Sequence, residues 1–297
     1  MRNYDLNIAG YIIRFVSAGN GPDLKFSERF HGYVGTGQEP VVTIVVHSGG
    51  FTIPPAAKKV FDALYVEEIS GIQTRKHDRF WRIYRDKDKL LIETFFPFAS
   101  GEKRALLKLS LRERSWEMWI PDEEINADPM EYPLDGLILY YLTVMHGDIF
   151  IHASGINKAG KGYLFSGISG KGKSTMADLW SKAGATVIHD DRLIIRNDGN
   201  NYVMHNTPVY DNDYPRNSPL HKVFIIDHGT ENQLTPVSGA SAVSLVTSNC
   251  IQHNWDATII NRLLDTVSSM CNTVPVAELM FRPDRKITDF ILENEHR

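Results

Sequence analysis

The chain has 297 residues, a net charge of -4 and an apolar content of 42%, which are ordinary values for a globular protein of one or two domains. The mild acidic charge argues against a nucleic acid as the main partner. Two cysteines, Cys250 and Cys271, give no disulfide framework. No segment has the pattern of a signal peptide or of a membrane span. These features predict a cytoplasmic protein without a membrane partner.

The chain up to about residue 120 is predicted to be rich in β-strands. Runs of β-branched and aromatic residues alternate there with clusters of Gly, Pro, Asn and Asp. Strands are expected at Tyr11–Val16, Val41–Val46, Arg79–Arg85, Leu90–Phe96, Leu106–Leu111 and Trp116–Ile120. We interpret residues 1–128 as a β-rich N-terminal domain that helps to choose a substrate. The acidic, turn-rich stretch Pro121–Pro129 is interpreted as the linker.

Residues 129–297 show an alternation of strand and helix patterns. A largely buried helix is expected at Leu134–Met145. Strands are expected at Asp148–His152, Gly162–Phe165, Thr186–His189, Leu193–Arg196, Val223–Asp227 and Ala277–Phe281, and helices at Ser174–Ala183, Ala240–Thr247 and Trp255–Met270. This alternation predicts an α/β domain whose ligand lies at the carboxyl ends of the strands.

The segment Gly167–Ser174 reads Gly-Ile-Ser-Gly-Lys-Gly-Lys-Ser and fits the pattern of a phosphate-binding loop. A predicted strand precedes it and a predicted helix follows it, and this context favours a nucleotide site over a chance glycine-rich turn. The glycines let the backbone curl so that amide groups point inward, and the helix N-terminus adds positive charge. The expected nucleotide-binding residues are Gly167, Ser169, Gly170, Lys171, Gly172, Lys173, Ser174 and Thr175.

Within this loop two side chains have specific predicted roles. Lys173 is expected to reach the terminal phosphates of ATP, and the Ser174 hydroxyl is expected to bind Mg²⁺. A second signal, Asp190-Asp191, follows the strand that comes after the loop helix. One carboxylate would hold the metal, and the other would accept the proton of an attacking hydroxyl. The alternative is an ordinary Asp-Asp turn that closes a strand.

These motifs resemble the catalytic core of HPr kinase/phosphorylase and its relatives, a superfamily that includes ATP-dependent phosphoenolpyruvate carboxykinase. The resemblance is carried by His152-Ala-Ser-Gly, by Gly162–Thr175 and by Val187-Ile-His-Asp-Asp, and it covers about residues 148–285. It implies a serine kinase that uses ATP and Mg²⁺. By motif position, Asp191 is then the candidate catalytic base, Asp190 the metal contact and His152 a neighbour of the acceptor.

The sequence therefore predicts an HPr-kinase-like enzyme that phosphorylates a serine of a protein or peptide. A non-catalytic, ATP-binding regulatory module and a small-molecule kinase are the alternatives. Arg216 is interpreted either as a group that neutralises the transferred phosphate or as a solvated loop arginine. A homo-oligomer is compatible with the sequence, which does not determine the oligomeric state.

Overall fold

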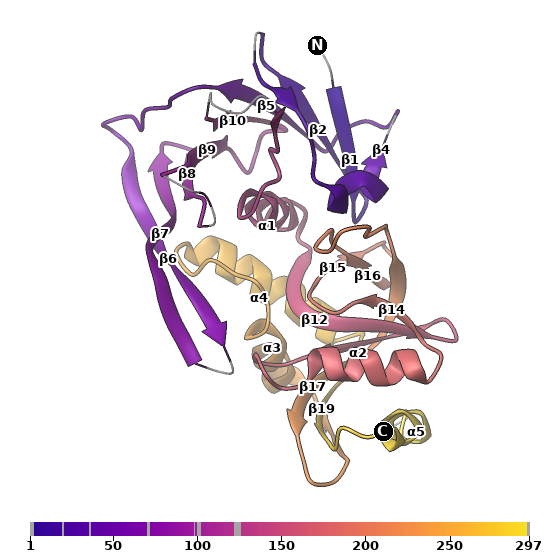
Figure 1. The fold of residues 1–297 in the computed structure, drawn as a ribbon. Coiled ribbons are helices and arrows are strands. Elements are labelled where there is room, and N and C mark those ends of the chain that lie inside the picture. Colours follow the sequence, from indigo (N-terminus) through magenta and orange to yellow (C-terminus); the bar gives the residue numbers. More distant parts are fainter. Residues whose placement is uncertain are drawn as a thin grey trace. The chain divides into compact units, whose positions relative to one another are not determined.

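The computed structural model describes residues 3–19, 21–35, 37–69, 72–97, 99, 102–121 and 126–295, and the side chains at 66–69, 72–78 and 126 lie outside this description. The described residues form a mixed α/β protein with large β-sheets (Figure 1). The chain has two compact units: unit 1 comprises Met1–Met145 and Tyr210–Tyr214, and unit 2 comprises His146–Val209 and Pro215–Arg297. In the expected linker, residues 122–125 lie outside the described residues. The interpretation of 1–128 and 129–297 as functional domains stays a prediction.

Unit 1 is built on a nine-stranded sheet in the order β4-β1-β2-β5-β10-β9-β8-β7-β6. Its strands are β1 (Asn3–Ile8), β2 (Tyr11–Ser17), β4 (Val34–Gly35), β5 (Val42–Ser48), β6 (Lys58–Ile69), β7 (Ile72–Asp86), β8 (Lys89–Phe95), β9 (Arg104–Leu109) and β10 (Ser115–Ile120). A separate pair joins β3 (Asp23–Leu24) to β11 (Asn126–Ala127), and a short 3-10 helix, η1, spans Glu28–Tyr33. Helix α1 (Leu134–His146) lies on the inner face of the sheet (Figure 1).

The alternation of apolar residues explains the core of unit 1. Along β5 the side chains of Val42, Ile44 and Val46 are fully buried, while the residues between them are half-buried. Strand β10 pairs in parallel with β5 and buries Trp116 and Met118 in the same way. The strands expected in this half and the helix expected at Leu134–Met145 are therefore confirmed.

The described residues of unit 2 form an eight-stranded sheet and four helices. Its strands are β12 (Ile149–Lys158), β13 (Lys161–Ser166), β14 (Thr186–His189), β15 (Arg192–Asn197), β16 (Tyr202–Asn206), β17 (Asn217–His228), β18 (Gln233–Val237) and β19 (Val276–Phe281). Its helices are α2 (Lys173–Lys182), α3 (Gly239–Thr247), α4 (Ala257–Cys271) and α5 (Lys286–Glu293). All strands and helices expected in this half are confirmed, and β16, β18 and α5 are additional.

The two long strands β12 and β17 organise unit 2. Residues 149–152 of β12 pair with β15, whereas residues 153–158 pair with β13. Strand β17 pairs with β16 through residues 217–219 and with β13 from Leu220 onward. Because β13, β17 and β19 run parallel, their carboxyl ends meet at one edge of the sheet.

Helices cover both faces of this sheet. Leu164, Val223 and Val276 belong to a core cluster that includes residues of α3 and α4. Their sequence neighbours Phe165, Phe224 and Ala277 belong to a second cluster with residues of α2 and α5. Since successive strand residues point to opposite faces, the sheet is the middle layer of three.

In the described part of the chain, no helix has both the length and the apolar character that crossing a bilayer requires.

Candidate functional site

The glycine-rich loop connects β13 to α2 at the carboxyl edge of the sheet. Strand β13 ends at Ser166, and Gly167 lies so close to β17 that an added Cβ atom would be 2.8 Å from the carbonyl oxygen of Ile226. Such a contact is too short for any side chain. Gly167 therefore allows the loop to leave the sheet directly beside the neighbouring strand.

The second half of the loop uses left-handed backbone conformations to expose the N-terminus of α2. Gly170 and Gly172 have φ angles of +81° and +91°, and Gly172 is the N-cap residue, without a side-chain cap. The amide of Met176 bonds to the carbonyl of Gly172 at 2.9 Å, so the amides of Lys173, Ser174 and Thr175 belong to the first turn, which has no acceptor within the helix. This end of α2 is suited to an anion.

Lys173 places a positive charge inside the loop. The buried Lys173 side chain donates from Nζ to the carbonyl oxygens of Gly167 at 2.7 Å and Ile168 at 3.2 Å. These hydrogen bonds stabilise the conformation of the loop. Ser169 and the Ser174 and Thr175 side chains are exposed around it.

Strand β17 holds the outer part of the loop through two residues that the sequence analysis missed. The Lys171 ammonium donates to Asp227 Oδ1 at 2.7 Å, and His228 Nε2 lies 3.0 Å from the carbonyl oxygen of Gly170. The hydrogen bond from Lys171 holds the pKa of the Asp227 carboxyl below its usual range. The available signal was an Asp-His pair directly after the apolar run Val223–Ile226.

The acidic pair lies at the same edge as the loop. Strands β13 and β14 both run antiparallel to β12, so both end in the same direction. The carbonyl oxygen of Asp191 accepts a hydrogen bond from the amide of Ala153 at 3.0 Å, and Ala153 is paired with Ser166. Asp191 therefore lies on the other side of β12 from Ser166, the residue that precedes the loop, at two strand spacings or about 10 Å.

His152 connects the Asp191 side chain to the strand that leads into the loop. Its Nδ1 atom lies 3.1 Å from Asp191 Oδ1, and its carbonyl oxygen accepts a hydrogen bond from Ser166 Oγ at 2.9 Å. The Nε atom of Arg192 lies 3.3 Å from Asp191 Oδ2. The structure thus brings three predicted features together: His152, Asp191 and the loop.

These contacts set the charge of Asp191. Burial raises the pKa of its carboxyl, but the hydrogen bond from His152 and the positive charge of Arg192 outweigh burial, so the pKa is below the ordinary value of 3.8. The carboxylate is therefore ionised at neutral pH.

His189 gives the turn that follows β14 its shape. Its buried ring accepts hydrogen bonds at Nδ1 from the amides of Asp191 at 3.1 Å and Arg192 at 3.3 Å. Asp190 is half-buried in this turn. The order His-Asp-Asp at the end of the strand thus has a structural reason, because the His189 ring fixes the backbone of the turn that carries the two aspartates.

Arg216 has a local structural contact. Its NH1 atom donates to the carbonyl oxygen of Val187 at 3.3 Å, and its side chain is half-buried against β14. It is therefore not a fully solvated loop arginine.

The metal contacts that the sequence predicts are oxygen atoms of Ser174 and Asp190. Among the described residues, no group of three or more His, Cys, Asp or Glu side chains is arranged to hold a metal ion. Magnesium commonly binds through one or two protein oxygens together with substrate phosphates and water, and the Ser174 hydroxyl and the Asp190 carboxylate are oxygen donors of the kind that it prefers.

Comparison with protein-family models finds no match, and comparison with curated proteins finds none either. Among solved structures, the HPr(Ser) kinase/phosphatase from Coxiella burnetii is similar at 9% sequence identity and a TM-score of 0.31. The similarity covers 50% of this chain and 95% of that one. A TM-score this low does not establish a shared fold, and the function of the site has to be inferred from its own geometry.

Proposed function

We propose that this chain is an ATP-dependent kinase that phosphorylates a serine of a protein or peptide. The observation that carries the proposal is the meeting, at one edge of one sheet, of a cationic glycine-rich loop and an ionised aspartate. A loop that only binds nucleotide does not need a carboxylate poised beside the phosphates. A phosphotransferase does, because the acceptor hydroxyl must lose its proton.

The loop residues fit the triphosphate of ATP. An added Cβ at Gly170 would meet no atom within 4 Å, so the tip of the loop is open, and the first amides of α2 offer donors to phosphate oxygens. Lys173 supplies a charge inside the loop and Lys171 a charge at its rim, where Asp227 holds it.

Bound ATP with Mg²⁺ would supply the phosphoryl group and the positive charge that offsets its oxygens. In this proposal Ser174 and Asp190 hold the metal. Ser169 within the loop and Thr175 directly after it add hydroxyl donors. The roles of these four residues follow from their positions in the loop and in the turn after β14.

Asp191 is the proposed catalytic base. Its carboxylate accepts the proton of the acceptor serine while the serine oxygen forms its bond to phosphorus and the bond from phosphorus to the leaving oxygen of ADP breaks. His152 is a positioning residue, because it holds one oxygen of Asp191 at 3.1 Å and leaves the carboxylate charged.

The test uses the whole chain with radiolabelled ATP, magnesium and a cell extract as the source of acceptor. We expect label on protein, phosphoserine after acid hydrolysis, and loss of transfer when magnesium is chelated. A fluorescent ATP analogue measures binding separately. Binding without transfer would favour the regulatory module, and label on small molecules alone would favour the small-molecule kinase.

A further inference from the structure

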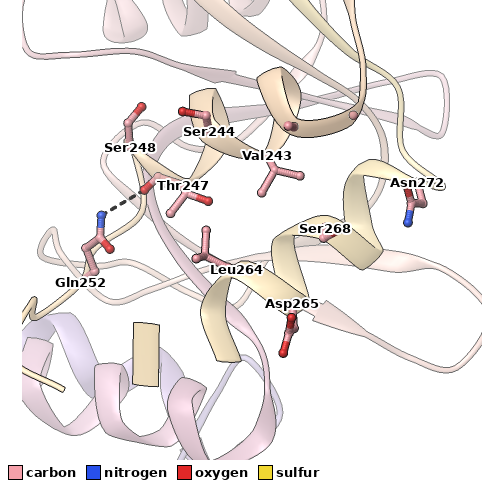
Figure 2. Close-up of a pocket in the computed structure, with 11 residues that line it drawn as sticks. Val243, Ser244, Thr247, Ser248, Gln252, Leu264, Asp265, Ser268 and Asn272 are labelled. Atoms are coloured by element: carbon pink, nitrogen blue, oxygen red, sulfur yellow. Dashed lines mark hydrogen bonds between the residues drawn. The ribbon is translucent and has the colours of Figure 1, made fainter. Parts of the chain in front are cut away.

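Helices α3 and α4 leave an open groove between them on the surface of unit 2 (Figure 2). Its volume is about 760 Å³, and residues of both helices line it together with Gln252. Most of the lining side chains, among them Ser244, Ser248, Leu264 and Asp265, are exposed. The groove is thus a surface channel and not an enclosed small-molecule cavity.

The lining of the groove suits an extended polypeptide. Small side chains, including Ser244 and Ser268, allow a backbone to approach closely, and hydroxyl and amide groups can bond to its peptide units. Val243 and Leu264 offer an apolar contact for a side chain. Helix α3 has nine residues and is about 13 Å long, which matches roughly four residues of extended chain.

One end of the groove leads, through the next residue of the chain, to the backbone of His152. Thr247 and Ser248 line it, and the next residue, Asn249, accepts a hydrogen bond at its carbonyl oxygen from the amide of His152 at 3.2 Å. The amide of Ile251 bonds in turn to the carbonyl of Phe150 at 2.7 Å. This segment borders β12 directly beyond the position where its partner β13 ends and the glycine-rich loop begins.

We propose that the groove between α3 and α4 binds a segment of the acceptor polypeptide, with the phosphorylated serine just beyond the Ser248 end, at His152 and Asp191. This inference rests on the proposed kinase function. Asp265 is the charged side chain of the lining, so the bound segment is neutral or basic near that position and not acidic.

The probe is a degenerate peptide library with one fixed central serine, used with radiolabelled ATP and magnesium. Ser268→Trp and Ser244→Trp place an indole ring in the groove. Ser269→Trp is the control, because Ser269 follows Ser268 in α4, is exposed and does not line the groove. We expect both groove variants to lose at least about tenfold in kcat/KM for the library, because the ring excludes the peptide. Nucleotide affinity and thermal unfolding should stay at wild-type values, and Ser269→Trp should behave as wild type.

Asp265→Lys gives a second measurement that does not depend on filling the groove. We expect the selected peptides to shift from basic to acidic residues at one position of the segment that occupies the groove. Wild-type transfer by both groove variants, or equal transfer to free serine, would overturn the inference and leave the kinase function intact. A wild-type chain without affinity for ATP would overturn both.

Discussion

The Nδ1 atom of His152 on β12 lies 3.1 Å from Oδ1 of Asp191, which belongs to the turn between β14 and β15. The contact holds an ionised carboxylate across β12 from the residue that precedes the glycine-rich loop. It also explains why the charge of Asp191 survives partial burial, since a hydrogen bond and a neighbouring guanidinium favour the ionised form.

Removal of the Asp191 charge is the most direct test of its role as base. We expect Asp191→Asn to lower phosphoryl transfer by about 10²- to 10⁴-fold, because the amide cannot accept the serine proton. Affinity for ATP should change little. Asp178→Asn, at an exposed carboxylate on α2, is the matched control. Full transfer by Asp191→Asn would exclude this residue as the base.

The contact with His152 makes a prediction about pH. The hydrogen bond from His152 lowers the pKa of Asp191, and His152→Gln weakens this bond. The effect of burial then raises the pKa of Asp191. The carboxylate then protonates at higher pH, and the acid limb of the kcat profile should move upward in pH while transfer at neutral pH falls about tenfold or less. An unshifted acid limb would mean that His152 does not set the charge of the base.

Lys173 should control nucleotide affinity. Its ammonium is buried within the loop, so Lys173→Met removes a charge that phosphate oxygens would meet without competing solvent. We expect a loss of about 10- to 100-fold in affinity for a fluorescent ATP analogue, measured by titration. Lys182→Met, at an exposed lysine at the end of α2, should leave affinity unchanged. Equal affinities for both variants would place the nucleotide elsewhere.

Gly172 combines backbone strain with a steric limit, and the chain offers a control that has only the strain. Gly199 has a φ angle of +95° and open space around it, so Gly199→Ala should cost about 1–2 kcal/mol of unfolding free energy. In Gly172→Ala the new Cβ also lies 2.8 Å from Phe281 Cζ, which should add about 1–3 kcal/mol. Urea denaturation measures the unfolding free energy of both variants. Equal losses of unfolding free energy would show that the Phe281 ring moves aside without cost.

Glu295 fixes the end of the described chain to β13. Its Oε1 atom accepts hydrogen bonds from Tyr163 OH at 2.5 Å and from Lys161 Nζ at 2.8 Å. Burial raises the pKa of Glu295, but these hydrogen bonds outweigh it and the net pKa is below 4.5. The stabilisation is therefore present above pH 4.5 and is lost as the pH falls below it.

For Glu295→Gln we expect a loss of about 1 kcal/mol in unfolding free energy at neutral pH and a smaller difference from wild type in acid. Glu293→Gln, at the exposed end of α5, is the control and should match wild type. A difference that stays constant with pH would mean that the ionisation of Glu295 does not contribute.

Local patterns in the sequence determined much of unit 2. The apolar run before Gly167 and the helical spacing after Ser174 predict β13 and α2, because both depend on residues close together in the chain. Elements with mixed patterns were missed. Strand β1 contains Asn and Asp, and β18 is an edge strand with Pro236, a residue that breaks the usual strand signal.

Only the tertiary structure decided which distant residues meet. The contacts of Asp227 and His228 with the loop form because β17 lies beside β13. The hydrogen bond between Asn249 and His152 forms because the segment around Asn249 continues along β12 where β13 has ended. Sequence spacing carries no information about such pairings, because the order of strands is set by how whole sheets and helices bury their apolar faces. The sequence by itself determined that a glycine-rich loop lies between a strand and a helix, and the packing of the sheet determined the neighbours of that loop.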